Sequence, residues 1–140
     1  MTPKLDKKIF TQFKHLFVDP SQPASPPLTP LPLRQGFTFE HGDGWYDLIR
    51  TLCYCISQHV KARQITEPNF KVLVVQVKEK FGTLRFYYGG GDEVIQGMVN
   101  LAEQLSAKTC EQCGRVKDVS TSGKCWVVTR CPVCLMDHTL

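Results

Sequence analysis

Apolar residues recur with the period of an α-helix in three stretches of the chain, residues 2–18, 45–63 and 93–108. Thr2 can cap the first stretch, and Pro3 suits its first helical position. Each stretch is therefore expected to be an amphipathic helix, and the apolar arcs of the second and third should face a core. The arcs consist of Leu5, Ile9, Phe10, Phe13, Leu16 and Phe17, then Trp45, Leu48, Ile49, Leu52, Ile56 and Val60, then Val94, Ile95, Met98, Val99, Leu101, Ala102 and Leu105.

Two strands are predicted between the second and third helices. The sequence FKVLVVQVKEKFGTLRFYY, residues 70–88, is rich in β-branched and aromatic residues and is interrupted near residues 80–82. Its first half is apolar on both faces at its centre, which is typical of a central strand. GFTFE, residues 36–40, is a candidate short strand. We therefore predict an α+β body in which a β-hairpin, or small antiparallel sheet, is packed by two amphipathic helices.

A proline-rich stretch separates the first helix from this body. Residues 19–34, DPSQPASPPLTPLPLR, hold six of the nine prolines, which excludes a helix or a central strand. An extended tether is the simplest interpretation, and a ligand for an aromatic groove is the alternative. The predicted organisation is an N-terminal amphipathic helix (1–18) on a Pro-rich linker (19–35), an α+β body (36–108) and a cysteine-rich C-terminal segment (109–140).

Composition places the chain among soluble globular proteins of about one domain. Of its 140 residues, 42% are hydrophobic and 21% charged, which is too apolar for a disordered chain. The N-terminal residues carry charges and no apolar run of signal-peptide length, and the β-branched run at 72–75 is too short to span a bilayer. We therefore expect a cytoplasmic protein without a membrane span, whose thiols stay reduced or bind metal.

The C-terminal segment carries two CxxC pairs, Cys110/Cys113 and Cys131/Cys134, with 17 residues between them. Each CxxC turn supplies two thiolates, and four thiolates make the tetrahedral site that structural Zn²⁺ prefers. Gly114 permits the tight backbone after the first pair. RVKDVS and CWVVTR, on either side of a TSGK turn, can form the connecting hairpin. We therefore predict a zinc ribbon that holds one structural Zn²⁺ ion.

The other three cysteines are not expected to bind this metal. Cys53 and Cys55 lie two apart on a predicted helix, so their side chains point about 200° apart and cannot share an ion. Cys125 is expected to be a small packed residue on a strand of the ribbon. His138, four residues after the last cysteine, is an alternative fourth ligand. The odd total of seven cysteines argues against a disulfide framework.

No catalytic constellation is predicted. YYGGGDEV, residues 87–94, places three glycines between a strand and a helix, as a phosphate-binding loop does. Asp92 and Glu93, however, put negative charge where an anion would bind, so a loop with a helix cap is the preferred interpretation. His41 and Asp43 could form an acid–base pair, but Asp43 is explained as a cap of the following helix. We expect a protein that is not an enzyme.

The charge balance gives weak support to nucleic-acid binding. The formal net charge is +4 with neutral thiols, and four thiolates with one Zn²⁺ would lower it to about +2. Tyr87, Tyr88 and Trp126 could stack on bases, but they lie in predicted strands where burial is equally expected. We expect weak, salt-sensitive and sequence-independent binding at most. The candidate residues are the basic side chains of the ribbon, Lys108, Arg115, Lys117, Lys124 and Arg130.

Protein binding has stronger candidates. The first helix would expose Phe10, Phe13 and Phe17, and such a patch seldom stays bare on a soluble monomer. We expect it to pack across the body, onto a second copy of the chain in a homodimer, or into a groove of a partner. Tyr54 lies on the polar face of the second helix. These four aromatic residues are the candidate partner-binding residues.

Four motifs carry a resemblance to known proteins: GDGWYDLI, VKEKFGTLRFYY, TCEQCG and RCPVC. Together they resemble a group of small proteins encoded by bacteriophages and prophages, over residues 36–134. The resemblance implies a viral origin, a pair of zinc knuckles and action inside a bacterial host cell. We therefore expect a non-catalytic zinc-ribbon protein that binds a host protein or ribonucleoprotein complex, as an inhibitor of host defence machinery such as CRISPR complexes. The alternative is a zinc-ribbon protein that binds nucleic acid.

Overall fold

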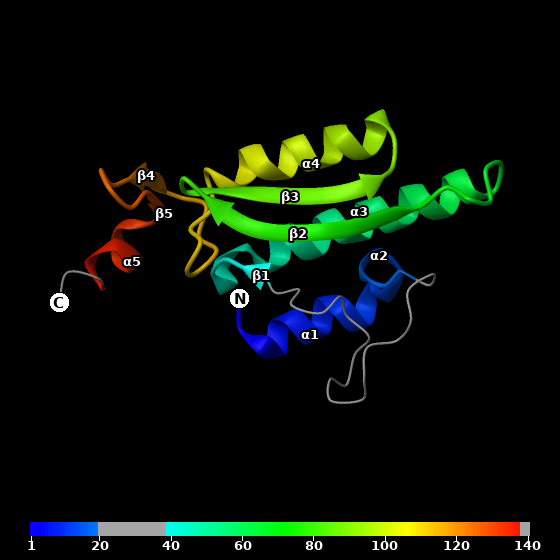
Figure 1. The fold of residues 1–140 in the computed structure, drawn as a ribbon. Coiled ribbons are helices and arrows are strands. Elements are labelled where there is room, and N and C mark those ends of the chain that lie inside the picture. Colours follow the sequence, from blue (N-terminus) through cyan, green and yellow to red (C-terminus); the bar gives the residue numbers. More distant parts are fainter. Residues whose placement is uncertain (20–38, 138–140) are drawn as a thin grey trace.

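The computed structural model describes residues 1–19 and 39–137. The described chain forms a helix-covered sheet with a smaller two-stranded sheet at its C-terminal end, which confirms the predicted α+β class (Figure 1). The predicted proline-rich linker lies almost entirely outside the described residues. The elements are α1 (Pro3–Gln12), α2 (Lys14–Phe17), β1 (Phe39–Glu40), the 3₁₀ helix η1 (Asp43–Trp45), α3 (Tyr46–Gln64), β2 (Val72–Lys80), β3 (Thr83–Gly90), α4 (Glu93–Ser106), β4 (Ser120–Ser122), β5 (Val128–Arg130) and α5 (Pro132–Met136).

The larger sheet has the strand order β1–β2–β3, so β2 is central, as predicted. β2 and β3 pair antiparallel, and the two residues between them, Phe81 and Gly82, form a tight turn with φ angles of 53° and 78°. β1 pairs parallel with β2, which adds a strand direction that the antiparallel prediction did not include. The parallel pair is possible because α3 supplies the crossover between β1 and β2.

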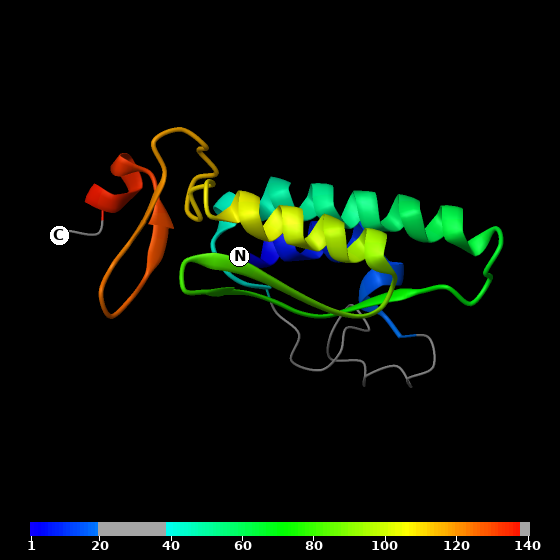
Figure 2. The same ribbon diagram turned by 90° about the horizontal axis from the view of Figure 1, so that it is seen from above.

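Helices cover one face of this sheet. In Figure 2, α3 and α4 lie together on one side of β2 and β3. Side chains alternate accordingly: Val77 and Phe86 are buried on the helix side, whereas Tyr87 on the opposite side is 42% exposed. Within the described ranges, no helix lies over that opposite side. The sheet therefore has a core face and an outer face.

The N-terminal helices belong to the same core. The rings of Phe10 and Phe17 lie with their centroids 5.1 and 5.8 Å from that of Phe39 on β1. The predicted single helix is interrupted at Phe13, whose φ and ψ are −122° and 36°. The first helix thus packs across the body of its own chain, which is one of the three places expected for it. Its residues that are at most 5% exposed are Ile9, Phe10, Phe13, Leu16 and Phe17.

Asp92 joins α3 to α4. Its Oδ1 accepts the Ile95 N–H, which caps α4 as predicted. Its Oδ2 lies 2.7 Å from His59 Nε2 and accepts from Arg63 Nη1 at 3.2 Å, both on α3. Asp43 does not cap α3, so that prediction is wrong: its Oδ1 accepts the backbone N–H of Thr2 at 2.6 Å.

The apolar residues of α4 are divided between core and surface. Ile95 is fully buried, but Val94, Leu101 and Leu105 are 49%, 62% and 44% exposed. The prediction that these three face inward is wrong. At 100° per residue they lie about 80–120° around the helix from Ile95. The main packing partners of α4 are α3 and β3, and the residues of α4 that they bury lie on the arc centred on Ile95.

Candidate metal centre and the surrounding surfaces

Four thiols meet at the C-terminal end of the fold. The Sγ atoms of Cys110, Cys113, Cys131 and Cys134 all lie within 4.8 Å of one another, and those of Cys113 and Cys131 are 3.7 Å apart. A tetrahedral site with metal–sulfur bonds of about 2.3 Å has sulfur–sulfur distances of about 3.8 Å. Cys113 is exposed and the other three are buried. The arrangement is compatible with a metal site and confirms that these four cysteines come together.

Local sequence explains both knuckles. In the first, Gly114 donates its N–H to the Cys110 carbonyl at 2.9 Å and has a φ of 80°, which glycine adopts without strain. The Cys110 N–H in turn donates to the Arg115 carbonyl at 2.8 Å. The second knuckle begins α5, where Cys131 is the N-cap residue and Pro132 lies in the first turn. Each knuckle is therefore shaped by its own backbone hydrogen bonds.

The four thiols differ in proton affinity. Burial raises the pKa of Cys110, but N–H groups of Cys131, Cys113 and Gln112 that donate to its sulfur outweigh burial and lower the pKa to about 6. The Cys134 N–H lowers the pKa of Cys131 in the same way. Burial and the neighbouring thiols raise the pKa of Cys134. Thiolate charge on such a cluster is best compensated by a bound cation.

The first knuckle sits on the glycine turn of the body. Gly44 donates its N–H to the Glu111 carbonyl at 2.7 Å, and Trp45 Nε1 donates to the Thr109 carbonyl at 2.9 Å. A Cβ at Gly44 would lie 2.6 Å from the Glu111 carbonyl oxygen, and one at Gly42 would overlap the same residue. The two glycines of GDGW are thus needed for this close backbone approach. The sequence pattern had predicted only a turn at Gly42 and Gly44.

The ribbon, residues 109–137, has a second attachment on the β2–β3 turn. Thr129 of β5 donates its hydroxyl to the Gly82 carbonyl and lies 2.8 Å from the Thr121 hydroxyl of β4. A Cβ at Gly82 would lie 3.2 Å from a methyl carbon of Val127. The turn between β2 and β3 therefore fixes the position of the β4–β5 hairpin.

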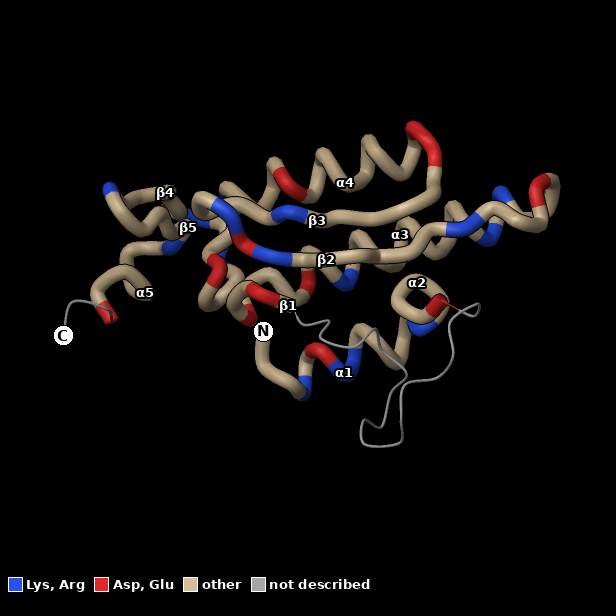
Figure 3. The backbone as a smooth tube through the Cα atoms, in the orientation of Figure 1, with Lys and Arg blue, Asp and Glu red and all other residues tan. Residues whose placement is uncertain are grey.

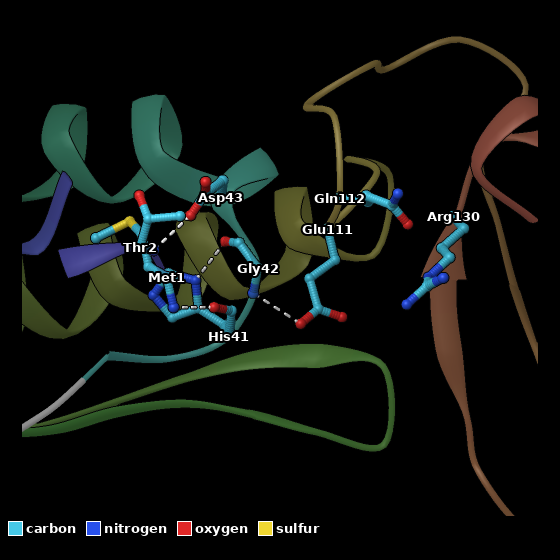
Figure 4. Close-up of a pocket in the computed structure, with 8 residues that line it drawn as sticks. All are labelled: Met1, Thr2, His41, Gly42, Asp43, Glu111, Gln112 and Arg130. Atoms are coloured by element: carbon cyan, nitrogen blue, oxygen red, sulfur yellow. Dashed lines mark hydrogen bonds between the residues drawn. The ribbon is translucent and has the colours of Figure 1, made fainter. Parts of the chain in front are cut away.

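A pocket of about 470 Å³ lies between the body and the ribbon (Figure 4). The Glu111 carboxylate and the Arg130 guanidinium point toward each other across it. Glu111 Oε1 accepts the Gly42 N–H at 2.9 Å, and burial raises the pKa of Glu111. The Nε of Arg130 is buried and has no hydrogen-bond partner among the described residues. The other lining residues are Met1, Thr2, His41, Gly42, Asp43 and Gln112.

His41 and Asp43 both line this pocket, but they form hydrogen bonds with different residues. His41 Nδ1 donates to the Gly42 carbonyl at 2.8 Å, and burial lowers the pKa of the imidazole to about 4. The Asp43 carboxylate accepts a hydrogen bond from the backbone N–H of Thr2. Both contacts are structural: His41 bonds to its neighbour Gly42, whereas Asp43 ties the start of α1 to the glycine turn. The expectation of a non-enzyme remains a prediction.

The remaining cysteines are spread over three environments. Cys53 is buried in α3, where burial raises its pKa, and Cys55 is exposed. Cys125 is exposed, so the prediction of a packed strand residue is wrong. Its strand begins only at Val128, which leaves Cys125 in the preceding loop. His138, the alternative ligand, lies outside the described residues.

Of the four predicted partner-binding residues, three are buried and one is exposed. Phe10, Phe13 and Phe17 are 3–5% exposed and packed in the core of their own chain, so the prediction that they are surface anchors is wrong. A homodimer through the N-terminal helix stays a prediction. Tyr54 is 51% exposed, as its polar-face position predicted. An amphipathic pattern shows that a helix has an apolar side but not which surface covers it.

The basic ribbon residues remain candidates for nucleic-acid contacts. Arg130 is half-buried beside the pocket, whereas the other four are exposed. Their exposure is the ordinary state of charged side chains and does not test the prediction. The four are Lys108, Arg115, Lys117 and Lys124.

Two of the three candidate stacking residues are exposed. Tyr87 and Trp126 are 42% and 77% exposed, whereas Tyr88 is half-buried and donates its hydroxyl to Gln96. Phe81, in the β2–β3 turn, is 70% exposed and was missed by sequence reasoning. Its signal in the sequence is an aromatic residue before glycine at a two-residue turn, a place that favours asparagine or glycine.

Comparisons with protein-family models, curated proteins and solved structures found no match to this chain. No helix of the described residues is long and apolar enough to cross a membrane. The metal centre and the exposed surfaces are therefore the features that bear on function.

Proposed function

We propose that the protein is a non-catalytic binding module, stabilised by one structural zinc ion, that docks on a protein partner through α4. The proposal depends on one row of residues, the α4 seam: Val94, Met98, Leu101 and Leu105. Their spacing of four, three and four residues is that of a helix-packing seam. Three of them are exposed although the other side of α4 is fixed in the core. Such a row on a rigid helix is typical of a docking surface for another protein.

Gly97 supports this use of the seam. It lies in the interior of α4, where glycine costs about 1 kcal/mol relative to alanine. A Cβ at Gly97 would meet no atom of the described residues within 4 Å beyond its own helix backbone, so packing among these residues does not require glycine. Gly97 lies one helical turn before Leu101. A missing side chain there allows the backbone of a partner to approach α4 closely.

Zinc is the metal that the donor set supports best. Four sulfur ligands at tetrahedral spacing suit Zn²⁺, whose structural sites are closed and four-coordinate. All four ligands would come from the chain, which leaves no open position for a substrate. We infer that the ion holds the two knuckles together and contributes to the folding of the ribbon, not to a reaction.

The partner that we propose is a protein or ribonucleoprotein complex of a bacterial host. The support for this choice is the resemblance of GDGW, KEKFGTLRFYY and the CxxC pairs to phage and prophage proteins. Inhibition of a host defence complex, such as a CRISPR complex, is the specific form of the proposal. Nucleic-acid binding, the alternative function, concerns a different face of the molecule.

Leu101→Asp tests the proposal. Leu101 is 62% exposed, so a carboxylate there should leave the fold intact. Gln104→Asp is the matched control, because it adds the same charge at an exposed polar position of α4 outside the seam. Tagged zinc-loaded wild type and both variants are incubated with lysate of a bacterial host. Captured proteins are identified by mass spectrometry and measured again as purified proteins.

We expect wild type and Gln104→Asp to bind the same partner with similar affinity, and Leu101→Asp to bind it at least tenfold more weakly. A partner that Leu101→Asp binds as well as wild type would overturn the role of the seam. A wild-type dimer that Leu101→Asp dissociates would place a second copy on the seam, against the proposed host partner.

A further inference from the structure

The outer face of the β1–β2–β3 sheet carries basic side chains at positions set by the strand register. Glu40, Lys78 and Arg85 are cross-strand neighbours in one row. Tyr87 occupies the next row, and Lys80 lies at the hairpin end. Figure 3 shows Lys and Arg positions near the hairpin end of β2 and β3. Three cations against one carboxylate make this face positive, although the protein as a whole is nearly balanced.

Each exposed aromatic ring on this face has a lysine beside it. Lys78 Nζ lies 5.9 Å from the centroid of the Tyr87 ring, and Lys80 Nζ lies 5.7 Å from that of Phe81. Tyr87 and Phe81 are 42% and 70% exposed. The face therefore places positive charges beside flat apolar rings.

Phe81 occupies its position at a cost to the fold. Its φ of 53° lies in the left-handed region, which is an outlier for a bulky residue and favours asparagine or glycine. The side chain is mostly exposed, so burial does not compensate for the strained backbone. Apart from the exposed lysine beside its ring, no interaction among the described residues offsets this strain, and strained residues of this kind cluster at binding sites.

The ribbon extends this face at a corner. In Figure 2 the loop between β4 and β5 lies on the side of the sheet that is away from α3 and α4. That loop carries Trp126, which is 77% exposed, and Lys124. Val127 packs against Gly82, so Trp126 and Phe81 are each one residue from the contact between the two hairpins. Trp126 and Phe81 thus flank the same backbone contact although they are far apart in the sequence.

We propose that this aromatic–basic face binds single-stranded nucleic acid, with three rings as stacking surfaces for bases and three lysines as phosphate contacts. Unpaired bases stack on exposed aromatic rings, whereas the bases of a duplex are not available to them. The lysines beside Tyr87 and Phe81 match the regular alternation of base and phosphate along a strand. The inference goes beyond the proposed protein docking, which uses α4. The residues of the aromatic–basic face are Lys78, Lys80, Phe81, Tyr87, Lys124 and Trp126.

Phe81→Asn is the decisive variant, because it should separate binding from stability. Asparagine tolerates the left-handed backbone, so the variant should unfold at the same temperature as wild type or higher. Binding should weaken about fivefold or more, since one stacking surface is lost. Trp126→Ala should weaken binding by a similar factor. Tyr54→Ala removes an equally exposed aromatic residue from α3, and Leu101→Asp alters the α4 seam; both should bind as wild type does.

The assay is fluorescence anisotropy of zinc-loaded full-length protein with labelled 12-nucleotide single-stranded RNA and DNA and a 12-base-pair DNA duplex. We expect both single strands to bind at least tenfold more tightly than the duplex, with a log–log salt slope of about −2 from three phosphate contacts. Polyglutamate serves as an acidic polymer without bases. Equal binding of polyglutamate or of the duplex, no binding of single strands, or wild-type affinity of Phe81→Asn would each overturn the proposal.

Discussion

Replacing Gly44 with alanine adds one methyl group at the contact between the ribbon and the body. The substitution therefore tests that contact. A Cβ at this position would lie 2.6 Å from the Glu111 carbonyl oxygen and overlap that of Cys110. Gly44→Ala must therefore displace the first knuckle. The displacement disrupts two hydrogen bonds, Gly44 N–H to Glu111 at 2.7 Å and Trp45 Nε1 to Thr109 at 2.9 Å. At about 1 kcal/mol each, their loss should destabilise the protein by about 2 kcal/mol and lower Tm by roughly 6–8 °C.

Gly97→Ala is the matched control for this experiment. It adds the same methyl group where the described residues place no atom within 4 Å other than the helix's own backbone, in a helix interior that favours alanine. It should stabilise the protein by about 1 kcal/mol and raise Tm by roughly 3 °C. Thermal unfolding followed by circular dichroism, on zinc-loaded protein, measures both. A Gly44→Ala variant as stable as wild type would refute the close approach of knuckle and glycine turn.

Three further changes test other parts of the structure. Serine at any one of the four clustered cysteines should abolish stoichiometric zinc in metal analysis, whereas Cys125→Ser should retain one zinc per chain. Phe17→Ala should destabilise the protein by about 3–5 kcal/mol in denaturant unfolding, because the ring is buried in the common core; a loss below 1 kcal/mol would contradict that position. Burial raises the pKa of Asp6 to about 6, above its ordinary 3.8, so the folded state binds this proton more tightly and loses stability as the pH rises from about 4 to 6. Asp6→Asn should therefore raise Tm relative to wild type at pH 7.5 and not at pH 3.5.

Local patterns in the sequence were enough to predict the features that depend on near neighbours. The pairing of β2 with β3 follows from two β-rich runs around Phe81 and Gly82, which permit only a short turn. The cap of α4 follows from Asp92 directly before an apolar period. The convergence of the four ligand cysteines follows from CxxC spacing, because each pair needs only one turn of backbone.

Features that depend on distant segments were not predictable in this way. The α4 pattern gives a wide apolar arc, but only tertiary packing decides that Ile95 is covered and Leu101 is not. The sequence left three surfaces on which the N-terminal phenylalanines could pack. Their packing within their own chain depends on Phe39 of β1, which is distant in the sequence. The role of Gly44 is also long-range, because the backbone that approaches it comes from Glu111.

The ribbon takes part in one proposed surface and not in the other. Trp126 and Lys124 lie in its loop, and Thr129 fixes that loop against the β2–β3 turn. The α4 seam is positioned by Ile95 and Asp92, which contact the body and not the metal centre. Removal of zinc should therefore weaken binding of single-stranded nucleic acid and leave binding through α4 largely unchanged. Since one surface belongs to the helix layer and the other to the outer face of the sheet, both can be occupied together, and a ribonucleoprotein complex is the class of partner that offers both ligands.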